Sequence, residues 1–285
     1  MQRHAGTGAG ATHWSVFGGA QPCSGVRSLL TRHVLAGRKI APLTPSERAQ
    51  LEGAISEVRQ VAARTVLVRR GEELEHSTLL LKGFLSRYVD DRRGHRQFVS
   101  LHVPGDLVDL HAYPMKQLDH DVAAVSDAEV AIMPHTAIKA ITAADAELAR
   151  KLWFATLLDA AMHREWIFRL GRLDATGRVC HFFAETGARL QAVGLGGLAS
   201  FSLPMTQAEL GDACALTSVH VSRVLKGLRD GGICTFRDGE VSIHDPALLA
   251  RRGQFDPTYL YLQPSHAIRA QKETPHVRQP DPTFR

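Results

Sequence analysis

Short runs of hydrophobic residues alternate with turn signals between residues 63 and 134. Arg70-Gly71, Lys82-Gly83, Arg93-Gly94 and Pro104-Gly105 are turns of this kind. Many short β-prone runs with frequent turns are typical of an antiparallel barrel or roll. The pattern predicts strands over residues 65–68, 78–81, 84–89, 97–103, 122–125 and 129–133.

Helical spacing precedes and follows this β-rich region. Before it, residues 42–47 resemble a helix entry, and the spacing places Leu51, Ala54, Ile55 and Val58 on one helical face. Well after it, Asp174 or Thr176 can cap a helix, and a glycine-rich loop over residues 194–197 ends that segment. The buried face of this later helix is predicted to hold Val179, Phe182, Phe183 and Leu190.

Residues 145–170 are predicted to form one long helix, because their apolar positions step by three or four. A second side of the helix carries Trp153, Leu157 and Phe168. A helix with two apolar sides has two surfaces to cover, one against its own roll and one against the same helix of a second subunit. A core helix that buries a single surface is the alternative. The predicted dimer interface consists of Leu148, Leu152, Ala155, Leu158 and Met162.

Residues 206–226 have the spacing of a helix-turn-helix, in which two short helices meet at a sharp turn. Thr206 can cap the first helix and Thr217 the second. Gly211 falls where the helices approach most closely. Ala215 occupies the position that turns left-handed, at a cost of roughly 1 kcal/mol. Apolar residues fall on the expected contact positions, namely Leu210, Cys214, Leu216, Val221 and Val224.

The segment after the helix-turn-helix favours a DNA-binding interpretation over an ordinary helical hairpin within a larger core. Residues 233–236 and 240–243 are short β-prone runs that flank Arg237-Asp238-Gly239. An Asp-Gly pair between such runs is a strong signal for a β-hairpin. A helix-turn-helix followed by a hairpin is the winged-helix arrangement. Its second helix, which carries His220, Arg223 and Lys226 without a carboxylate, suits an approach to phosphates.

The overall charge gives no separate evidence for nucleic-acid binding. The net charge is +5, but the first 40 residues hold five basic and no acidic side chains, so the remainder is balanced. No apolar run approaches the 18 or so residues of a membrane span, and the N-terminus lacks a signal-peptide pattern, so we expect a cytoplasmic protein without membrane contact. Local placement of charge on the second helix is therefore the informative signal.

No catalytic group and no metal site is predicted. The cysteines Cys23, Cys180, Cys214 and Cys234 are scattered without a Cys-x-x-Cys pair, so reduced thiols are expected and an iron–sulfur cluster is not. The competing class is a cupin-like metal-binding or enzymatic β-barrel, which needs two closely spaced histidines and a downstream glutamate. The histidines of the roll match no ligand signature; they are His95, His102, His111, His120 and His135.

The order of β-roll, long helix and C-terminal winged helix-turn-helix resembles the Crp/Fnr family of bacterial transcription regulators. The match covers roughly residues 40–262, and its most specific stretches are 203–210 and 219–223. Residues 101–110, 118–124 and 255–262 are also similar to the family. The resemblance implies an α+β protein with an antiparallel β-roll (a double-stranded β-helix). It implies a homodimer that binds double-stranded DNA at an inverted repeat, with RNA polymerase as a further candidate partner.

The resemblance also divides the chain into five segments. We expect a disordered tail over residues 1–25, a cyclic-nucleotide-binding-like roll over 26–143, and a connecting and dimerisation helix over 144–171. A winged helix-turn-helix over 172–262 and a flexible tail over 263–285 complete the chain. A nucleotide-binding regulatory subunit without DNA binding is a third interpretation, which leaves the helix-turn-helix unexplained.

Individual DNA-binding residues follow from the family's motif. The arginine that reads guanine in relatives corresponds to Arg223, and the adjacent serine to Ser222. The family's glutamate is replaced by Val219, which cannot accept a hydrogen bond from cytosine but can contact a thymine methyl group. The half-site of relatives therefore does not transfer unchanged. The remaining predicted DNA contacts are Thr206, Gln207, Thr217, Ser218, His220 and Lys226.

The roll is expected to bind an unidentified effector or none. Cyclic-nucleotide-binding relatives hold the phosphate with an arginine-serine pair, and here that position falls near Leu118-Asp119, where a carboxylate repels a cyclic phosphate. Cyclic AMP or GMP is therefore not an expected ligand. If the roll retains a pocket, the resemblance places in it Asp106, Asp109, His111, Asp119 and His120.

Overall fold

An antiparallel roll forms the N-terminal half of the computed structural model, which describes residues 30–264. One sheet has the strand order β1-β7-β3 and the other β2-β6-β4-β5, and all pairs are antiparallel. The strands are β1 (Glu57–Val61), β2 (Val66–Val68), β3 (His76–Lys82), β4 (Leu85–Asp90), β5 (Arg96–His102), β6 (Asp121–Ala124) and β7 (Ala128–Pro134). The predicted α+β fold with a β-roll is confirmed.

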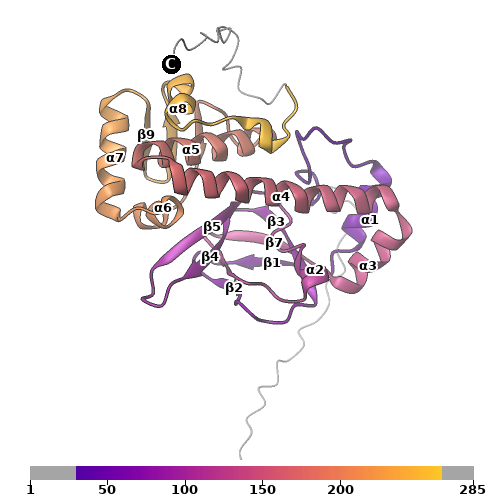
Figure 1. Ribbon diagram of the computed structural model, residues 1–285. Coiled ribbons are helices and arrows are strands. Elements are labelled where there is room, and N and C mark those ends of the chain that lie inside the picture. Colours follow the sequence, from indigo (N-terminus) through magenta and orange to yellow (C-terminus); the bar gives the residue numbers. More distant parts are fainter. Residues whose placement is uncertain (1–29, 265–285) are drawn as a thin grey trace, which may run out of the picture.

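Three short helices lie at one end of the roll (Figure 1): α1 (Pro45–Gly53), α2 (Ala112–Met115) and α3 (His135–Ala144). Thr44 and Glu47 form a capping box at the start of α1, as the helix-entry signal predicts. The expected continuation of this helix to Val58 is wrong. The helix ends at Gly53, and Val58 lies in β1 opposite Ala131 of β7. Pairing with the sheet decides the conformation there, and spacing alone could not show it.

The long helix α4 (Ala146–Arg172) crosses the molecule between the roll and the C-terminal part (Figure 1). Asp145 caps it by accepting a hydrogen bond from the Leu148 amide. The helix continues through Gly171, where the sequence predicted its end, and Leu173 takes the extended conformation. Asp174 then caps α5 (Ala175–Ala192), one of the two residues predicted for this role.

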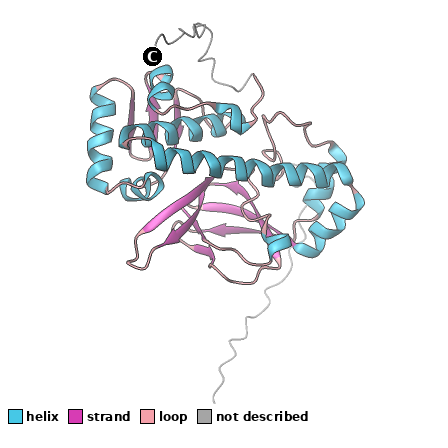
Figure 2. Cartoon of the chain, in the orientation of Figure 1, coloured by secondary structure: helices cyan, strands magenta, loops and turns pink. Residues whose placement is uncertain are grey.

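The C-terminal part is helical with one small sheet (Figure 2). Its sheet has the strand order β8-β10-β9. The elements after α5 are β8 (Ser200–Ser202), α6 (Gln207–Cys214), α7 (Ser218–Asp230), β9 (Cys234–Arg237), β10 (Glu240–Ile243), α8 (Pro246–Arg252) and the 3-10 helix η2 (Pro257–Leu260). The predicted tail 1–25, and all but the first two residues of the predicted tail 263–285, lie outside the described residues.

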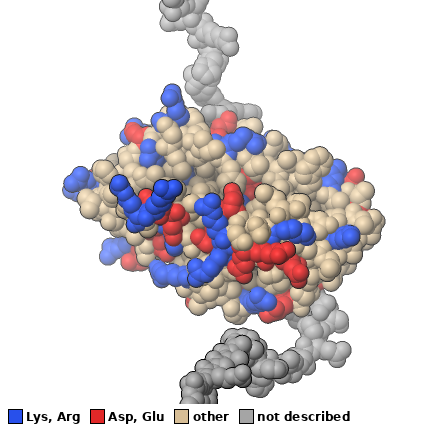
Figure 3. Space-filling view, turned by 60° about the horizontal axis from the view of Figure 1, so that its bottom comes forward, with Lys and Arg blue, Asp and Glu red and all other residues tan. Residues whose placement is uncertain are grey.

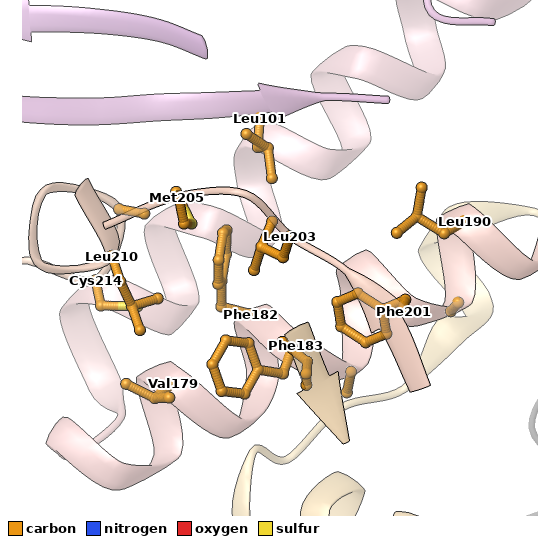
Figure 4. Close-up of a cluster of buried hydrophobic side chains, with 14 of the residues drawn as sticks. Leu101, Val179, Phe182, Phe183, Leu190, Phe201, Leu203, Met205, Leu210 and Cys214 are labelled. Atoms are coloured by element: carbon orange, nitrogen blue, oxygen red, sulfur yellow. The ribbon is translucent and has the colours of Figure 1, made fainter. Parts of the chain in front are cut away.

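One hydrophobic core joins the two halves. It contains Phe84, Phe98 and Leu101 from the roll together with Phe182 and Phe183 of α5. Figure 4 shows Leu101 beside the side chains that α5 and the helix-turn-helix contribute. The predicted buried face of α5 is confirmed, because its four residues are at most 2% exposed: Val179, Phe182, Phe183 and Leu190.

Candidate nucleic-acid interface

The first helix of the helix-turn-helix, α6, begins at a complete capping box. The Thr206 hydroxyl accepts a hydrogen bond from the Glu209 amide, and the Glu209 carboxylate accepts one from the Thr206 amide. These bonds satisfy backbone donors that would otherwise lack partners in the first turn. The capping residue Thr206 and its neighbour Gln207 are exposed, so the N-terminus of α6 is accessible to a phosphate group.

Two small residues set the turn between α6 and α7. Ala215 lies in the left-handed region with φ 52°, as predicted for this position. A Cβ atom added at Gly211 would lie 2.4 Å from the carbonyl oxygen of Leu216. Only glycine therefore allows the backbone of the turn to approach α6 this closely.

The second helix, α7, has one buried and one exposed face. Thr217 caps it by accepting a hydrogen bond from the His220 amide. Val221, Leu225 and Leu228 are buried against the domain core. The exposed face contains six of the predicted DNA-binding residues, namely Ser218, Val219, His220, Ser222, Arg223 and Lys226. Val219 is 59% exposed, which is unusual for a large apolar side chain and suits contact with another molecule.

The basic groups of α7 are available for an anionic partner. Neither Arg223 nor Lys226 takes part in an ion pair within the described residues, although Arg229 and Arg237 each pair with a neighbouring aspartate. Elsewhere the two signs of charge are mixed: Figure 3, which brings the lower side of the molecule forward, shows basic and acidic side chains interspersed. The local charge of α7 is thus more informative about an anionic partner than the charge of the whole chain.

The hairpin after α7 has the predicted turn. Asp238 and Gly239 both have positive φ angles, 52° and 77°, which is the conformation of a two-residue type I′ turn between β9 and β10. The sheet also contains β8, which pairs with β10 and which the sequence pattern did not reveal. Its three residues are too few to give a periodic signal. Together these elements form the predicted winged helix-turn-helix.

The polar residues predicted for an effector pocket separate into distinct environments. The Asp106 carboxylate binds Arg189 of α5 at 2.5 Å, and the Asp109 carboxylate accepts a hydrogen bond from the Thr78 amide. His111 and His120 lie together, with ring centroids 5.6 Å apart. Asp119 projects outward and bonds His120 Nδ1 at 2.7 Å. Asp106 lines a hollow beside α4 together with His102 and Asp159, whereas Asp109 is fully buried against Thr78. One effector pocket shared by all five residues stays a prediction.

A buried arginine that the sequence analysis missed controls the electrostatics between the roll and α4. Arg87 of β4 donates hydrogen bonds to the Val108 carbonyl oxygen and to Asp159 of α4. Burial and the nearby Arg87 guanidinium lower the pKa values of His102 and His111 to about 4. Both imidazoles are therefore neutral at pH 7. The occurrence of the charged Arg87 within a β-prone run was the sequence signal that could have revealed this buried residue.

The two sides of α4 differ from the prediction. Leu148, Leu152, Leu158 and Met162 are at most 8% exposed and pack into the cores of this same chain, and Ala155 is half-buried. The assignment of this stripe to the dimer interface is therefore wrong, since its apolar groups already have partners. The exposed side carries Trp153, Leu157 and Ile167, which are 66%, 52% and 72% exposed.

Two further observations limit the chemistry of the described part of the chain. Within residues 30–264, no group of three or more His, Cys, Asp or Glu side chains is arranged to hold a metal ion. No helix in that range is long and apolar enough to cross a membrane. Burial raises the pKa of the Cys180 thiol to about 12 and that of Cys214 to about 11, so both thiols are unreactive.

Comparisons with known proteins agree with this architecture. Residues 58–145 match the family model of the cyclic nucleotide-binding domain, and residues 177–252 match that of the Crp-like helix-turn-helix domain. The anaerobic regulatory protein of Haemophilus influenzae is 24% identical over 203 residues, which is 71% of this chain and 79% of the relative. The transcriptional activator protein FnrL of Cereibacter sphaeroides is 28% identical over 193 residues, 66% of this chain and 75% of the relative.

A solved structure shows the same fold over most of the described range. FixK2 from Bradyrhizobium japonicum superposes with a TM-score of 0.63 at 24% identity, covering 68% of this chain and 96% of that one. The two matched domains and the similar regulators support the same assignment. The chain therefore belongs to the Crp/Fnr family of DNA-binding transcription regulators.

Proposed function

We propose that this chain binds an inverted-repeat operator as a homodimer, with α7 of each copy in the major groove. The main support for this proposal is the exposed face of α7, which carries Ser222, Arg223 and Lys226. No Asp or Glu residue lies between Ser218 and Arg229 to repel a phosphate. Arg223 is suited to a bidentate hydrogen bond with guanine O6 and N7. Two such helices related by a two-fold axis read half-sites about 34 Å apart.

The outer side of α4 supports the homodimer. Trp153, Leu157 and Ile167 are spaced four and ten residues apart along the helix, so they lie on one side of it, and they are more than half exposed. Contact with the same side of a second copy buries these groups in a two-fold arrangement. RNA polymerase is a proposed further partner, and the protein is proposed to act in the cytoplasm without catalytic activity.

The roll is proposed to respond to an effector other than a cyclic nucleotide, or to act structurally. The guanidinium of Arg87 is already bound by Val108 and Asp159, so it is not free to hold a phosphate. Asp119, near the position where relatives hold the phosphate, is exposed and paired with His120. A cyclic phosphate there would meet a carboxylate of the same sign. No resident metal or cofactor is part of the proposal.

Arg223→Ala tests the role of α7. An operator is first selected from random DNA, and the ratio of the dissociation constants for operator and scrambled DNA is then measured. We expect this ratio to fall by at least about 30-fold, because the dimer loses two bidentate arginine–guanine contacts and each contributes about 1–3 kcal/mol of discrimination. Folding should be unchanged, since the Arg223 side chain is exposed.

Arg229→Ala is the matched control on the same helix. Arg229 is exposed but pairs with Asp230 at the C-terminal end of α7, so its loss should leave the ratio nearly unchanged. A variant Arg223→Ala that distinguishes operator from scrambled DNA as well as the wild type does would contradict the proposed reading role. Failure of the wild type to select any DNA sequence would contradict the proposed function itself.

A further inference from the structure

Four charged side chains lie together where the roll meets the DNA-binding domain. We call Arg38, Asp106, Glu185 and Arg189 the junction cluster. Arg38, Glu185 and Arg189 are 5%, 1% and 2% exposed, and the Asp106 side chain is 18% exposed. Buried charges are costly unless they are paired and hydrogen-bonded. The contacts of this cluster therefore show which parts of the molecule it holds together.

Arg189 of α5 contacts the roll through two nitrogens. Its Nη1 donates a hydrogen bond to the Leu101 carbonyl oxygen at 2.7 Å, and its Nη2 donates to the Asp106 carboxylate at 2.5 Å. Asp106 is held in turn by the Val103 amide at 3.0 Å and lies 3.4 Å from His102 Nδ1. The planar guanidinium thus joins α5 to two points of the segment at the end of β5.

The other two members of the cluster extend it to three more segments. Glu185 accepts hydrogen bonds from Trp166 Nε1 of α4 at 3.0 Å and from the Tyr259 hydroxyl of η2 at 2.6 Å. Arg38, from the segment before α1, donates to the Leu260 carbonyl oxygen at 2.6 Å. The cluster therefore links the roll, α4, α5 and both ends of the described chain.

Charge pairing stabilises the ionised form of the cluster. Burial raises the pKa of Asp106, but the Arg189 guanidinium outweighs this and holds that pKa well below its usual value. Burial likewise raises the pKa of Glu185, and Arg189 and His181 outweigh it. Burial and the neighbouring Arg189 lower the pKa of Arg38 to about 10, so Arg38 is still a cation at neutral pH. The cluster thus contains two cations and two anions, and Arg189 contacts both anions.

The hydrogen bonds and ion pairs of the junction cluster constrain the relative orientation of the roll and α5 more strongly than the hydrophobic core does. The apolar core in Figure 4 is formed by aliphatic and aromatic side chains, which resist separation but specify orientation weakly. The Arg189 contacts have fixed distances and directions, so they restrict the orientation of α5 against the roll. Gln97 of β5 and Arg169 of α4 add hydrogen bonds to carbonyl oxygens of α6. Because α5 packs on α6, α7 and α8, its orientation sets that of the recognition helix.

We propose that Asp106 and Arg189 are positioning residues for DNA binding, which hold α7 at the angle to α4 that an operator requires. This inference rests on the proposed operator-binding homodimer. The copies are related through α4, so a rotation of α5 against the roll displaces both recognition helices from adjacent major grooves. Arg189 acts through α5 and lies away from the exposed face of α7.

The test replaces the pair by apolar residues in a double variant, Asp106→Leu with Arg189→Met. Removing both charges leaves neither Asp106 nor Arg189 without the other, but Glu185 loses its contact with Arg189 at 3.7 Å. We therefore expect a lower melting temperature in a chain that still folds, because Trp166 and Tyr259 continue to donate hydrogen bonds to Glu185. The orientation of α5 should then be less restricted. If the competent orientation falls to about a tenth of the population, the dissociation constant for the operator rises about tenfold.

The orientation itself is measured without DNA. Spin labels are placed at Glu72→Cys in the roll and Asp230→Cys at the end of α7, both exposed, in full-length protein with Cys23→Ser. The buried Cys180, Cys214 and Cys234 have raised pKa values and do not compete for the label. Dilution with unlabelled chain gives one labelled copy per dimer. We expect a broadened or shifted distance distribution in the double variant.

Two further variants complete the test. Lys82→Met with Glu129→Leu removes an ion pair of the roll surface and should change neither the distances nor the affinity. Arg189→Lys keeps the charge but not the planar fork, so it should give an intermediate broadening, and it replaces the double variant if that one does not fold. An unchanged distance distribution, or an unchanged operator affinity, in a folded junction variant would overturn the inference. The distance measurement needs no DNA, so it still tests the role of the pair in orienting α5 if the wild type selects no operator.

Discussion

The inner and outer faces of α4 carry similar side chains in different environments. On the inner face, Leu158 is 6% exposed and packs against the roll and α5. The residue before it, Leu157, is 52% exposed on the outer face. The residue after it, Asp159, pairs with the buried Arg87 at 2.6 Å. Of these three consecutive residues, Leu157 faces a proposed second copy, Leu158 packs in the core, and Asp159 forms an ion pair with the roll.

This difference shows what helical periodicity can and cannot reveal. A step of three or four identifies faces of the helix, and Trp153 and Leu157 do lie on the outer one. Phe168, predicted with them, is only half-buried, and Ile167 is the third exposed apolar residue. It does not say which partner each face meets, because an apolar face is equally suited to its own domain and to another chain. The roll lies against one face in space, and this decided that Leu148, Leu152, Leu158 and Met162 are internal.

The largest expected effect is that of Leu158→Ala. Truncation of a buried leucine creates a cavity, so we expect the free energy of unfolding to fall by about 2–5 kcal/mol. Urea denaturation at one fixed protein concentration measures it. A loss below about 0.5 kcal/mol would show that the inner face is not packed as described.

Asp159→Asn should have an intermediate effect, of about 1–3 kcal/mol, because the buried Arg87 loses its anionic partner. Burial raises the pKa of Asp159, but Arg87 and His102 outweigh it and hold the pKa below its usual value. Since the folded-state pKa is depressed, this stability is present above the unfolded pKa, about 4, and is lost as the pH falls further. Denaturation curves between pH 3 and 7 should show a flatter pH dependence in the variant. Equal slopes would argue against the pairing.

Leu157→Ala should change the stability of the single chain least, by less than about 0.5 kcal/mol, because the side chain is exposed. Its expected effect is on association: sedimentation at a series of concentrations should show a weaker dimer, and Trp153→Glu a still weaker one. The exposed Lys139→Ala in α3, away from the outer face of α4, is the control. Unaltered dimerisation in both outer-face variants would exclude this face as the interface.

The helix-turn-helix was predictable in detail because its determinants are local. Thr206 and Thr217 cap helices a few residues away, and Ala215 and Gly211 act within one turn. The same holds for Asp238-Gly239 in the hairpin. Each signal depends on residues close in sequence, so their spacing carries the information.

The polar residues of the roll were less predictable. Asp106 was expected in an effector pocket, yet its partner Arg189 lies 83 residues away in the chain. Arg87 and Asp159 are similarly distant, at 72 residues. Neither pair leaves a periodic pattern, and the only local signal is a charged residue among apolar neighbours. Contacts of this kind depend on how the roll, α4 and α5 meet.

The sequence by itself determined the order of elements, the caps and turn of the helix-turn-helix, and the exposed basic face of α7. These properties follow from backbone preferences and side-chain spacing within a few residues. The tertiary structure decided which face of α4 is buried and which charges become partners. The reason is that burial and charge pairing depend on segments distant in sequence, whose approach is set by the packing of the whole chain.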